Sequence, residues 1–344
     1  MNGVSETPET ALVEFVLDHK LAEPDEPMSW TRLTGGVSSD LWRVELPGRS
    51  LCVKRALARL KVAADWQAPL SRNAAECAWL RYAARHIPDN VPTVLAHDPD
   101  AGLFAMTYLP PEHYPVWKAQ LLAGHVDPAT ADAVGRTLGR LHAVSAQDAS
   151  LAREFATDEN FEALRIEPYL RATAHAHPDL VDVIDALASR TADTRLALVH
   201  GDVSPKNILA GPVGPVLLDA ECAWYGDPAF DLAFCLNHLL LKCLAVPGNR
   251  AALRESADRL VRAYLGEVAW EKVADLEYRV ATLLPALLLA RVDGKSPVEY
   301  LTEPSDRDFV RETAQTLLTT PPLTLAGILD LWHADLNRRW VDRP

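Results

Sequence analysis

The feature that most constrains this chain is the eight-residue stretch His200–Asn207, which reads HGDVSPKN, together with Asp219. Asp202 stands five residues before Asn207, and Asp219 follows a short apolar run, so two acids and an amide recur at a defined spacing. Apolar residues before and after the stretch predict short strands that would hold these side chains on a rigid hairpin. The strands are expected at 196–199, 208–210 and 216–218.

The residue types in this stretch suit the transfer of a phosphoryl group. A carboxylate such as that of Asp202 can orient an acceptor hydroxyl and take its proton. The amide oxygen of Asn207 and the carboxylate of Asp219 are hard oxygen ligands of the kind that Mg²⁺ prefers. Asp, Pro, Lys and Asn are also ordinary turn residues, so an HGD triplet alone would indicate little. The complete pattern, with the amide and the second acid in place, is a strong signal.

These motifs resemble those of the aminoglycoside phosphotransferase and choline kinase family. The resemblance extends from about Leu33 to about Tyr300, and its motifs concentrate in residues 200–233, where 226–233 reads GDPAFDLA. It implies an α+β, bilobal protein-kinase-like fold. It also implies an ATP-dependent phosphotransferase that moves the γ-phosphoryl group to a hydroxyl of a small molecule, such as a sugar, an amino alcohol or an aminoglycoside-like acceptor. Asp202 would be catalytic, and Asn207 and Asp219 would hold Mg²⁺.

Three segments are similar, more narrowly, to methylthioribose kinases: residues 54–57, 219–226 and 290–294. This likeness makes a methylthioribose kinase-like sugar kinase the alternative function, and it places Arg291 and Trp224 among the candidate substrate residues. Methylthioribose kinases lack an amide side chain at the position of Asn207. The likeness therefore does not predict that this chain acts on the substrate of that subgroup. An arginine at a helix end that faces water and the helix dipole is an equally good interpretation of Arg291.

The first 108 residues predict a nucleotide-binding lobe with a five-stranded antiparallel sheet and one helix. Lys54 ends an apolar strand, where its ammonium would bind the α- and β-phosphates of ATP. Glu76, on the helix predicted at 71–86, is the candidate partner of Lys54, although a glutamate on a helix is most often simply solvated. The strands are expected at 31–33, 41–46, 51–54, 91–96 and 103–108.

A glycine- and serine-containing break separates the first two predicted strands. Glycines allow the backbone to approach a ligand closely, and hydroxyls add hydrogen-bond donors, so the loop could face phosphates. A plain hairpin turn is the alternative interpretation. The position of the loop, two strands before Lys54, favours the phosphate-binding one. Its candidate nucleotide-binding residues are Gly35, Gly36, Ser38 and Ser39.

The segment 107–111 breaks the strand pattern and predicts the boundary between the N-terminal lobe, 1–108, and a helical C-terminal lobe, 109–344. In a kinase-like fold this hinge would offer backbone hydrogen bonds to adenine. The second lobe would carry the catalytic loop and the acceptor site, and Asp231 at a helix start would brace the loop from below. Helices are expected at 128–145, 160–174, 180–189, 230–244, 251–265, 270–291, 307–318 and 324–340.

Composition argues against several other classes of protein. The net charge of −13 disfavours nucleic acid or an anionic membrane as the main partner. The five cysteines are odd in number and form no CxxC, so neither a disulfide framework nor a zinc site is indicated. No apolar run approaches the ~18 residues of a membrane span, and the N-terminus lacks the pattern of a signal peptide. A cytoplasmic enzyme with a small hydroxylated acceptor is the expectation.

Two rival functions can be weighed from the same residues. A catalytically silent kinase-like binding module usually loses one of Lys54, Asp202, Asn207 and Asp219, and all four are present. A protein kinase would need an activation segment, but the interval from Asp219 to Asp231 leaves room only for a short turn. The four residues therefore favour an active small-molecule kinase.

Overall fold

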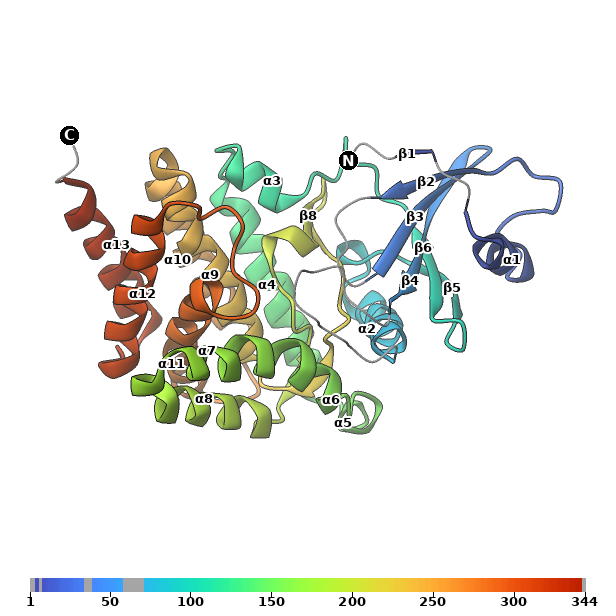
Figure 1. Cartoon of the computed structure of the whole chain (residues 1–344). Helices are drawn as coiled ribbons and strands as arrows, with labels where there is room; N and C mark the ends of the chain where they lie inside the picture. The colour runs from blue at the N-terminus through green and yellow to red at the C-terminus, as the bar shows by residue number, and fades with distance from the viewer. Residues whose placement is uncertain (1–3, 6–7, 34–38, 58–70, 342–344) are drawn as a thin grey trace.

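The computed structural model of the chain describes residues 4–5, 8–33, 39–57 and 71–341. Near the N-terminus, the strands form one antiparallel sheet in the order β1-β2-β3-β4-β6-β5 (Figure 1). The five strands predicted from the sequence are all present, and β1 is a two-residue addition that pairs with β2 at the edge. Their bounds are β1 Val4–Ser5, β2 Ser29–Leu33, β3 Ser39–Leu46, β4 Arg49–Ala56, β5 Val94–Asp98 and β6 Leu103–Thr107.

Strand β4 shows why the sheet is covered on both faces. Successive side chains of a strand point to opposite faces. Leu51 and Val53 accordingly join the hydrophobic cluster that helix α1 (Thr10–Asp18) completes, whereas Cys52 joins the cluster of α2 (Arg72–His86). Figure 1 shows the two helices on different sides of the sheet. Alternate side chains of β4 thus pack toward α1 on one face of the sheet and toward α2 on the other.

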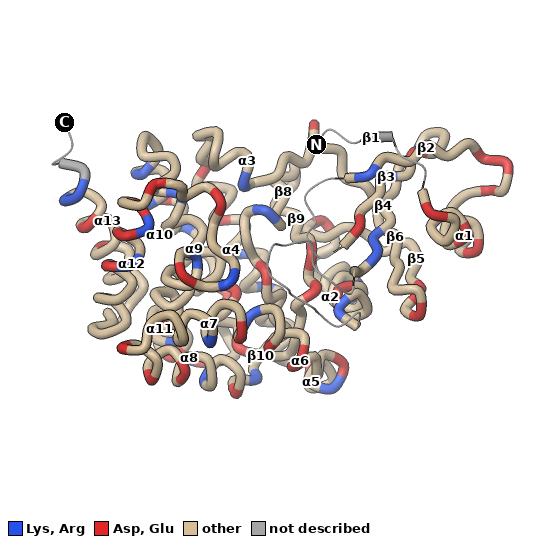
Figure 2. Tube along the Cα trace, in the orientation of Figure 1, with Lys and Arg blue, Asp and Glu red and all other residues tan. Residues whose placement is uncertain are grey.

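Helices make up most of the chain after β6, and the prediction of a mainly helical remainder is confirmed. Four short strands lie among them. The elements are α3 Trp117–Leu122, α4 Pro128–Ser145, α5 Leu151–Glu154, α6 Asp158–Phe161, η2 Glu162–Arg171, α7 Ala172–Ala176, α8 Val181–Asp193, β7 Ala197–Val199, β8 Ile208–Ala210, β9 Pro215–Leu217, β10 Trp224–Gly226, α9 Ala229–Ala245, α10 Arg250–Leu265, α11 Val273–Asp293, α12 Pro304–Thr319 and α13 Leu325–Val341. Figure 2 shows acidic positions along the outer turns of α8 and α1.

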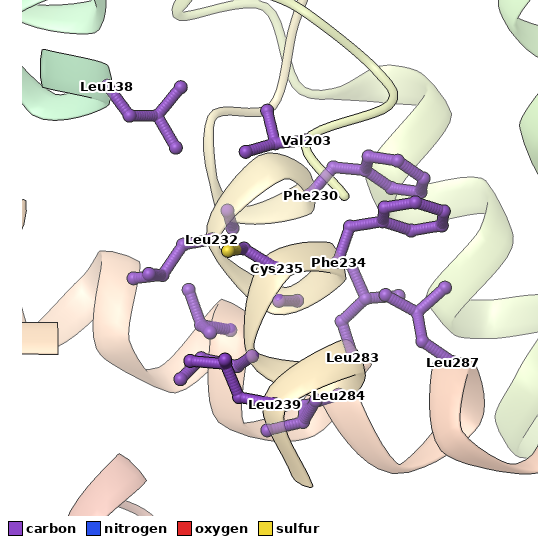
Figure 3. Close-up of a cluster of buried hydrophobic side chains, with 14 of the residues drawn as sticks. Leu138, Val203, Phe230, Leu232, Phe234, Cys235, Leu239, Leu283, Leu284 and Leu287 are labelled. Atoms are coloured by element: carbon purple, nitrogen blue, oxygen red, sulfur yellow. The ribbon is translucent and has the colours of Figure 1, made fainter. Parts of the chain in front are cut away.

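Helix α9 runs through the centre of the larger core. Its Phe230 and Phe234 rings stack with centroids 5.4 Å apart, and Leu283 and Leu287 of α11 lie beside them (Figure 3). The cluster includes Trp79 and Phe104 from the N-terminal part as well as residues as distant as Leu336. Because one core spans the predicted boundary near residue 108, the division into two lobes stays a prediction.

Two local features differ from the sequence-based expectation. Strands β8 and β9 pair as a hairpin, but β7 pairs with β10 instead of joining them. The helix expected at 160–174 is interrupted by η2, a π-helical stretch that contains Pro168. Proline has no N–H to donate within a helix, and a wider turn is a common way to accommodate that loss.

Within the described ranges, no single helix is both long and apolar enough to cross a membrane. The bent pair Ala229–Ala245 and Pro247–Leu265, with 118° between its helices, meets the criterion by length and composition only. The first helix of this pair, α9, is buried along nearly its whole length inside the fold.

The core around α9 yields a stability prediction. Leu284→Ala should lower the free energy of unfolding by about 2–5 kcal/mol, because the fully buried leucine leaves a cavity when it is shortened. The same change at Leu331, which is 43% exposed on α13, should cost no more than about 0.5 kcal/mol. Chemical denaturation measures both. Equal losses in the two variants would contradict the packing described for α9 and α11.

Candidate active site

The loop at 200–207 is held in place through its backbone. The Asp231 carboxylate, in the first turn of α9, accepts hydrogen bonds from the backbone amides of His200 at 2.7 Å and Gly201 at 2.8 Å. Gly201 has a φ of +78°, and a Cβ there would lie 2.7 Å from Cys222, so only glycine fits. The prediction that Asp231 braces the loop is confirmed by these bonds.

Within the loop, Asp202 and Asn207 contact each other. The Asn207 side-chain amide donates to the Asp202 backbone carbonyl at 3.2 Å, which directs the other amide atom, Oδ1, away as a possible ligand. The Asp202 carboxylate lies 2.8 Å from the Arg165 guanidinium and 3.3 Å from the Lys206 ammonium. Burial alone would raise the pKa of Asp202, but Arg165 and then Lys206 outweigh it and lower that pKa. The carboxylate is therefore ionised at neutral pH.

Arg165 is the main residue of this site that sequence reasoning missed. It lies on η2, is almost fully buried, and donates from Nε to the backbone carbonyl of Gly201. Its guanidinium carbon sits 5.6 Å from the ring centroids of both Tyr169 and Phe234. A lone arginine among apolar helix positions is a weak signal, because its partner Asp202 lies far away in the sequence.

A second group of charges joins the sheet to the segment after β9. The Lys54 ammonium, on β4, contacts both carboxylate oxygens of Glu76 on α2, at 2.7 and 2.8 Å, and also contacts Asp219. Burial lowers the pKa of Lys54, but attraction to Asp219 and Glu76 outweighs it and raises that pKa. Burial raises the pKa of Glu76 to about 7 in spite of Lys54. The predicted pairing of Lys54 with Glu76 is present.

Asp219 adopts an uncommon backbone conformation. Its φ is +66°, in the left-handed region that non-glycine residues seldom occupy. Such outliers persist only where the surrounding structure holds them, and they cluster at functional sites. Next to it, Glu221 accepts from the Arg72 guanidinium of α2 at 3.1 Å. Helix α2 is therefore joined to the segment 219–221 directly by Arg72, and indirectly by Glu76 through Lys54.

An apolar pocket opens where the sheet meets the segment predicted as the hinge. Its lining includes Thr107, Tyr108 and Leu109 of that segment, together with side chains from both sides of it. A pocket lined mainly by apolar side chains suits a heteroaromatic ring. The other lining residues that matter here are Leu41, Cys52, Met106 and Leu218.

Several predicted site residues lie elsewhere or outside the described residues. Gly35, Gly36 and Ser38 fall outside the ranges that the structure describes, and Ser39 begins β3, where it is buried and pairs with Ala56 of β4. Trp224 is buried in the core, stacked on Phe161 with centroids 4.2 Å apart. Its ring therefore offers no surface for a substrate, and we do not carry it into the proposed site.

Arg291 is buried rather than facing water at its helix end. One guanidinium nitrogen donates to the Tyr169 hydroxyl at 3.1 Å and to Ser296 Oγ at 3.0 Å. Since Tyr169 also contacts Arg165, Arg291 is connected to the surroundings of Asp202 through a single aromatic ring. The structure thus brings Arg291 near the loop that the sequence singles out.

Comparison with known proteins agrees with this arrangement. Residues 29–276 match the model of the phosphotransferase enzyme family. Methylthioribose kinases of Escherichia coli O45:K1 and Bacillus cereus strain G9842 are 27% and 24% identical over 250 and 288 residues. These matches cover 62% and 76% of this chain, but only 58% and 71% of those proteins.

Solved structures show the same fold at low sequence identity. Amicoumacin kinase hAmiN, in complex with AMP-PNP, Ca²⁺ and Ami, aligns with a TM-score of 0.55 and 16% identity over 92% of this chain and 98% of its own. A Plasmodium vivax ethanolamine kinase aligns with a TM-score of 0.55 and 11% identity over 97% and 88%. The predicted α+β, protein-kinase-like fold is confirmed.

The pair of Arg165 with Asp202 yields a prediction with a defined pH dependence. Arg165→Met should lower the free energy of unfolding at pH 7 by about 3–5 kcal/mol, because the buried Asp202 carboxylate loses its main partner. Without Arg165 the pKa of Asp202 rises, so protonation relieves the buried charge as the pH falls. The loss should therefore shrink between pH 7 and pH 4.

Arg171→Met is the matched control for that variant. Arg171 lies on the same π-helical stretch but pairs with Glu162 at the surface, so its removal should cost less than about 1 kcal/mol. Denaturant unfolding at a series of pH values measures both variants. A loss for Arg165→Met that stays constant from pH 7 to pH 4 would show that Arg165 does not act through the Asp202 charge.

Proposed function

Because the chain belongs to the phosphotransferase enzyme family, we propose that it transfers the γ-phosphoryl group of ATP to a hydroxyl of a small molecule. The observation that carries the proposal is the convergence of charges from three separate elements. Lys54 of β4 contacts both Glu76 of α2 and Asp219 after β9, and the loop with Asp202 and Asn207 lies directly before the β8–β9 hairpin. The proposed site thus lies where the sheet meets the helical remainder.

The nucleotide would bind with its adenine in the apolar pocket and its phosphates at Lys54. Thr107, Tyr108 and Leu109 of the hinge segment line this pocket, and their backbone groups would bond the ring edge. The Lys54 ammonium, held by Glu76, would contact the α- and β-phosphates. In this proposal the part of the chain up to residue 108 holds the nucleotide, and residues 109–344 carry the catalytic loop and the acceptor.

Two oxygen ligands of this site fit a magnesium ion. Asn207 Oδ1 is left available by the amide's bond to Asp202, and Asp219 supplies a partly exposed carboxylate. The described residues hold no group of three or more His, Cys, Asp and Glu that could bind a metal. A site with few protein ligands suits Mg²⁺, which keeps waters and substrate phosphates in its octahedral shell. When bound, the ion would neutralise charge on the phosphate oxygens.

Asp202 would position the acceptor hydroxyl and receive its proton. Its lowered pKa makes it a weak base. In a loose phosphoryl-transfer transition state, position and charge matter more than covalent assistance from the protein. Arg165 and Asn207 hold the Asp202 segment by a side-chain pair and a backbone bond, so the carboxylate is fixed before an acceptor arrives. Asp202 would therefore contribute both by orienting the hydroxyl and by receiving its proton.

A sugar kinase similar to methylthioribose kinases is the second candidate. The matches to methylthioribose kinases, which cover 62% and 76% of the length of this chain, support this candidate. Asn207 is the departure noted in the sequence, and it occupies a position that the wider family would use for a metal. A catalytically silent binding module is disfavoured, because Lys54, Glu76 and Asp219 are assembled in one network.

The role of Asp202 predicts a separation of binding from turnover. Asp202→Asn should bind ATP with magnesium as tightly as the parent, since Asp202 is assigned to the acceptor. Acceptor-dependent formation of ADP should fall ~10²–10⁴-fold, the usual contribution of a general acid or base. Calorimetry and a coupled assay over a panel of hydroxylated acceptors measure the two quantities.

Asp100→Asn, in an exposed turn between β5 and β6, is the control and should change neither quantity. The opposite pattern for Asp202→Asn, with nucleotide affinity lost and turnover at saturating ATP retained, would mean that Asp202 is a nucleotide or metal ligand.

The role of Lys54 predicts graded losses in two variants. Lys54→Met should lower kcat/KM for ATP by about 10–100-fold, which corresponds to one charge-assisted hydrogen bond. Glu76→Gln should give a smaller loss, because it acts only by holding Lys54. Lys272→Met, at an exposed position, should leave kcat/KM unchanged. A Glu76→Gln loss larger than that of Lys54→Met would refute this order of roles.

A further inference from the structure

Basic side chains gather around two tyrosines, and the first of them, Tyr169, contacts Arg165, the partner of Asp202. On one side, Arg165 and Arg291 lie over the ring of Tyr169, with guanidinium carbons 5.6 and 5.5 Å from its centroid. We call the basic cluster the five basic side chains that surround these two tyrosines, Tyr169 and Tyr300, together with the two tyrosines. The basic members come from five separate elements. They are Lys118 of α3, Arg165 of η2, Lys206 of the loop before β8, Lys242 of α9 and Arg291 of α11.

The second tyrosine of the basic cluster is Tyr300, in the segment between α11 and α12. The ammonium groups of Lys242 and Lys118 lie 4.9 and 5.8 Å from its ring centroid. His238, one turn before Lys242 on α9, stacks edge-on against Phe234 with centroids 5.3 Å apart, and Phe234 also contacts Arg165. The cluster is therefore continuous from Asp202 to Tyr300.

Negative charge within the described residues does not balance this cluster. Arg165 and Lys206 share the carboxylate of Asp202, and Lys118 pairs with Glu299. Lys242 and Arg291 form no ion pair with any carboxylate that the structure describes; their hydrogen bonds go to neutral groups. Figure 2 shows that acidic residues are plentiful elsewhere on the chain, so the imbalance is local.

Lys242 is the most unusual member, because its side chain is completely buried. Burial, reinforced by Lys118 and Arg291, lowers its pKa to about 7. A buried ammonium without a carboxylate partner is costly, and the same position in α9 could hold an apolar residue. The presence of a lysine there is explained if a negative group occupies the site during part of the reaction cycle.

Unpaired polar atoms mark where such a group would bind. Arg291 Nε and the Tyr300 hydroxyl are both buried, and neither has a hydrogen-bond partner among the residues that the structure describes. Buried polar groups are nearly always paired in folded proteins. Both atoms are hydrogen-bond donors, as an anion requires, and the Lys242 ammonium lies over the Tyr300 ring.

We propose that the acceptor whose hydroxyl contacts Asp202 also carries an anionic group, a carboxylate or a phosphate. Arg291 and Tyr300 bind this group, and the positive charge of Lys242 balances its negative charge. The inference rests on the proposed function and names the substrate class of the same site. An acceptor with an ammonium group would meet uncompensated positive charge here, and a neutral sugar would leave Lys242 and Arg291 unbalanced. Hydroxylated acids and sugar phosphates are the acceptor classes that fit.

Direct binding of simple anions tests the proposal without knowledge of the natural acceptor. Sulfate and D-gluconate are titrated by calorimetry into the protein saturated with AMP-PNP and magnesium, so that the phosphate-binding groups near Lys54 are already occupied. Wild type should bind one anion per chain. Lys242→Met and Arg291→Gln should each weaken this binding by about 10-fold or more, the effect of one charge-assisted contact.

Lys295→Met is the matched control. Lys295 is near in sequence to Arg291 but pairs with Glu167 at the surface, so its loss should leave anion binding unchanged. Lys242→Met replaces a buried charge with an apolar side chain of similar length, so it should remain folded. Absence of anion binding to wild type at millimolar concentration, or equal binding by wild type and Lys242→Met, would overturn the proposal.

Matched acceptor pairs then identify the anion. A coupled assay compares D-gluconate with D-glucitol, ribose 5-phosphate with ribose, and choline as a cationic acceptor. The anionic member of a pair should have the higher kcat/KM, and Lys242→Met should remove that advantage. Higher kcat/KM for the neutral members or for choline would contradict the proposal. Anion binding without any ATP binding would count against the proposed function alone.

Discussion

The structure of the candidate site depends on one buried group of charges, the Lys54 ammonium between the carboxylates of Glu76 and Asp219. Opposite charges attract strongly in a low-dielectric environment, so the ammonium holds both carboxylates. A bound magnesium ion would share the Asp219 carboxylate with Lys54. Since the three residues come from β4, α2 and the segment after β9, the same contacts tie the sheet to the helical part. Arg72 and Glu221 add a second ion pair between α2 and that segment.

The loop at 200–207 is held in shape mainly through its backbone. The Asp231 carboxylate accepts hydrogen bonds from two backbone amides of the loop. Gly201 has a positive φ at a place where only glycine fits, and Asp219 also has a positive φ. Arg165 then directs the Asp202 carboxylate from the side. The loop thus positions its acid through fixed hydrogen bonds, and an acceptor does not have to organise it.

Local pattern predicted most of the elements, and chain order predicted the pairing of Lys54 with Glu76. The strands β2 to β6 follow from alternation and turn residues, and α4 matches its predicted bounds. Arg165 escaped prediction because its partner Asp202 is brought to it only by tertiary packing. The pairing of β7 with β10 was missed because three-residue strands carry almost no periodic signal. The basic cluster spreads from Lys118 to Arg291, so no local window contains it.

Crystallography can show whether Asn207 and Asp219 hold the metal of a nucleotide that Lys54 binds. Crystals with AMP-PNP and Mn²⁺, an anomalous scatterer with ligand preferences similar to those of Mg²⁺, would locate the metal. We predict an anomalous peak at about 2.0–2.3 Å from Asn207 Oδ1 and an Asp219 carboxylate oxygen, with Lys54 Nζ bound to the α- or β-phosphate. A metal peak away from these two residues, with Lys54 facing no phosphate, would contradict this assignment.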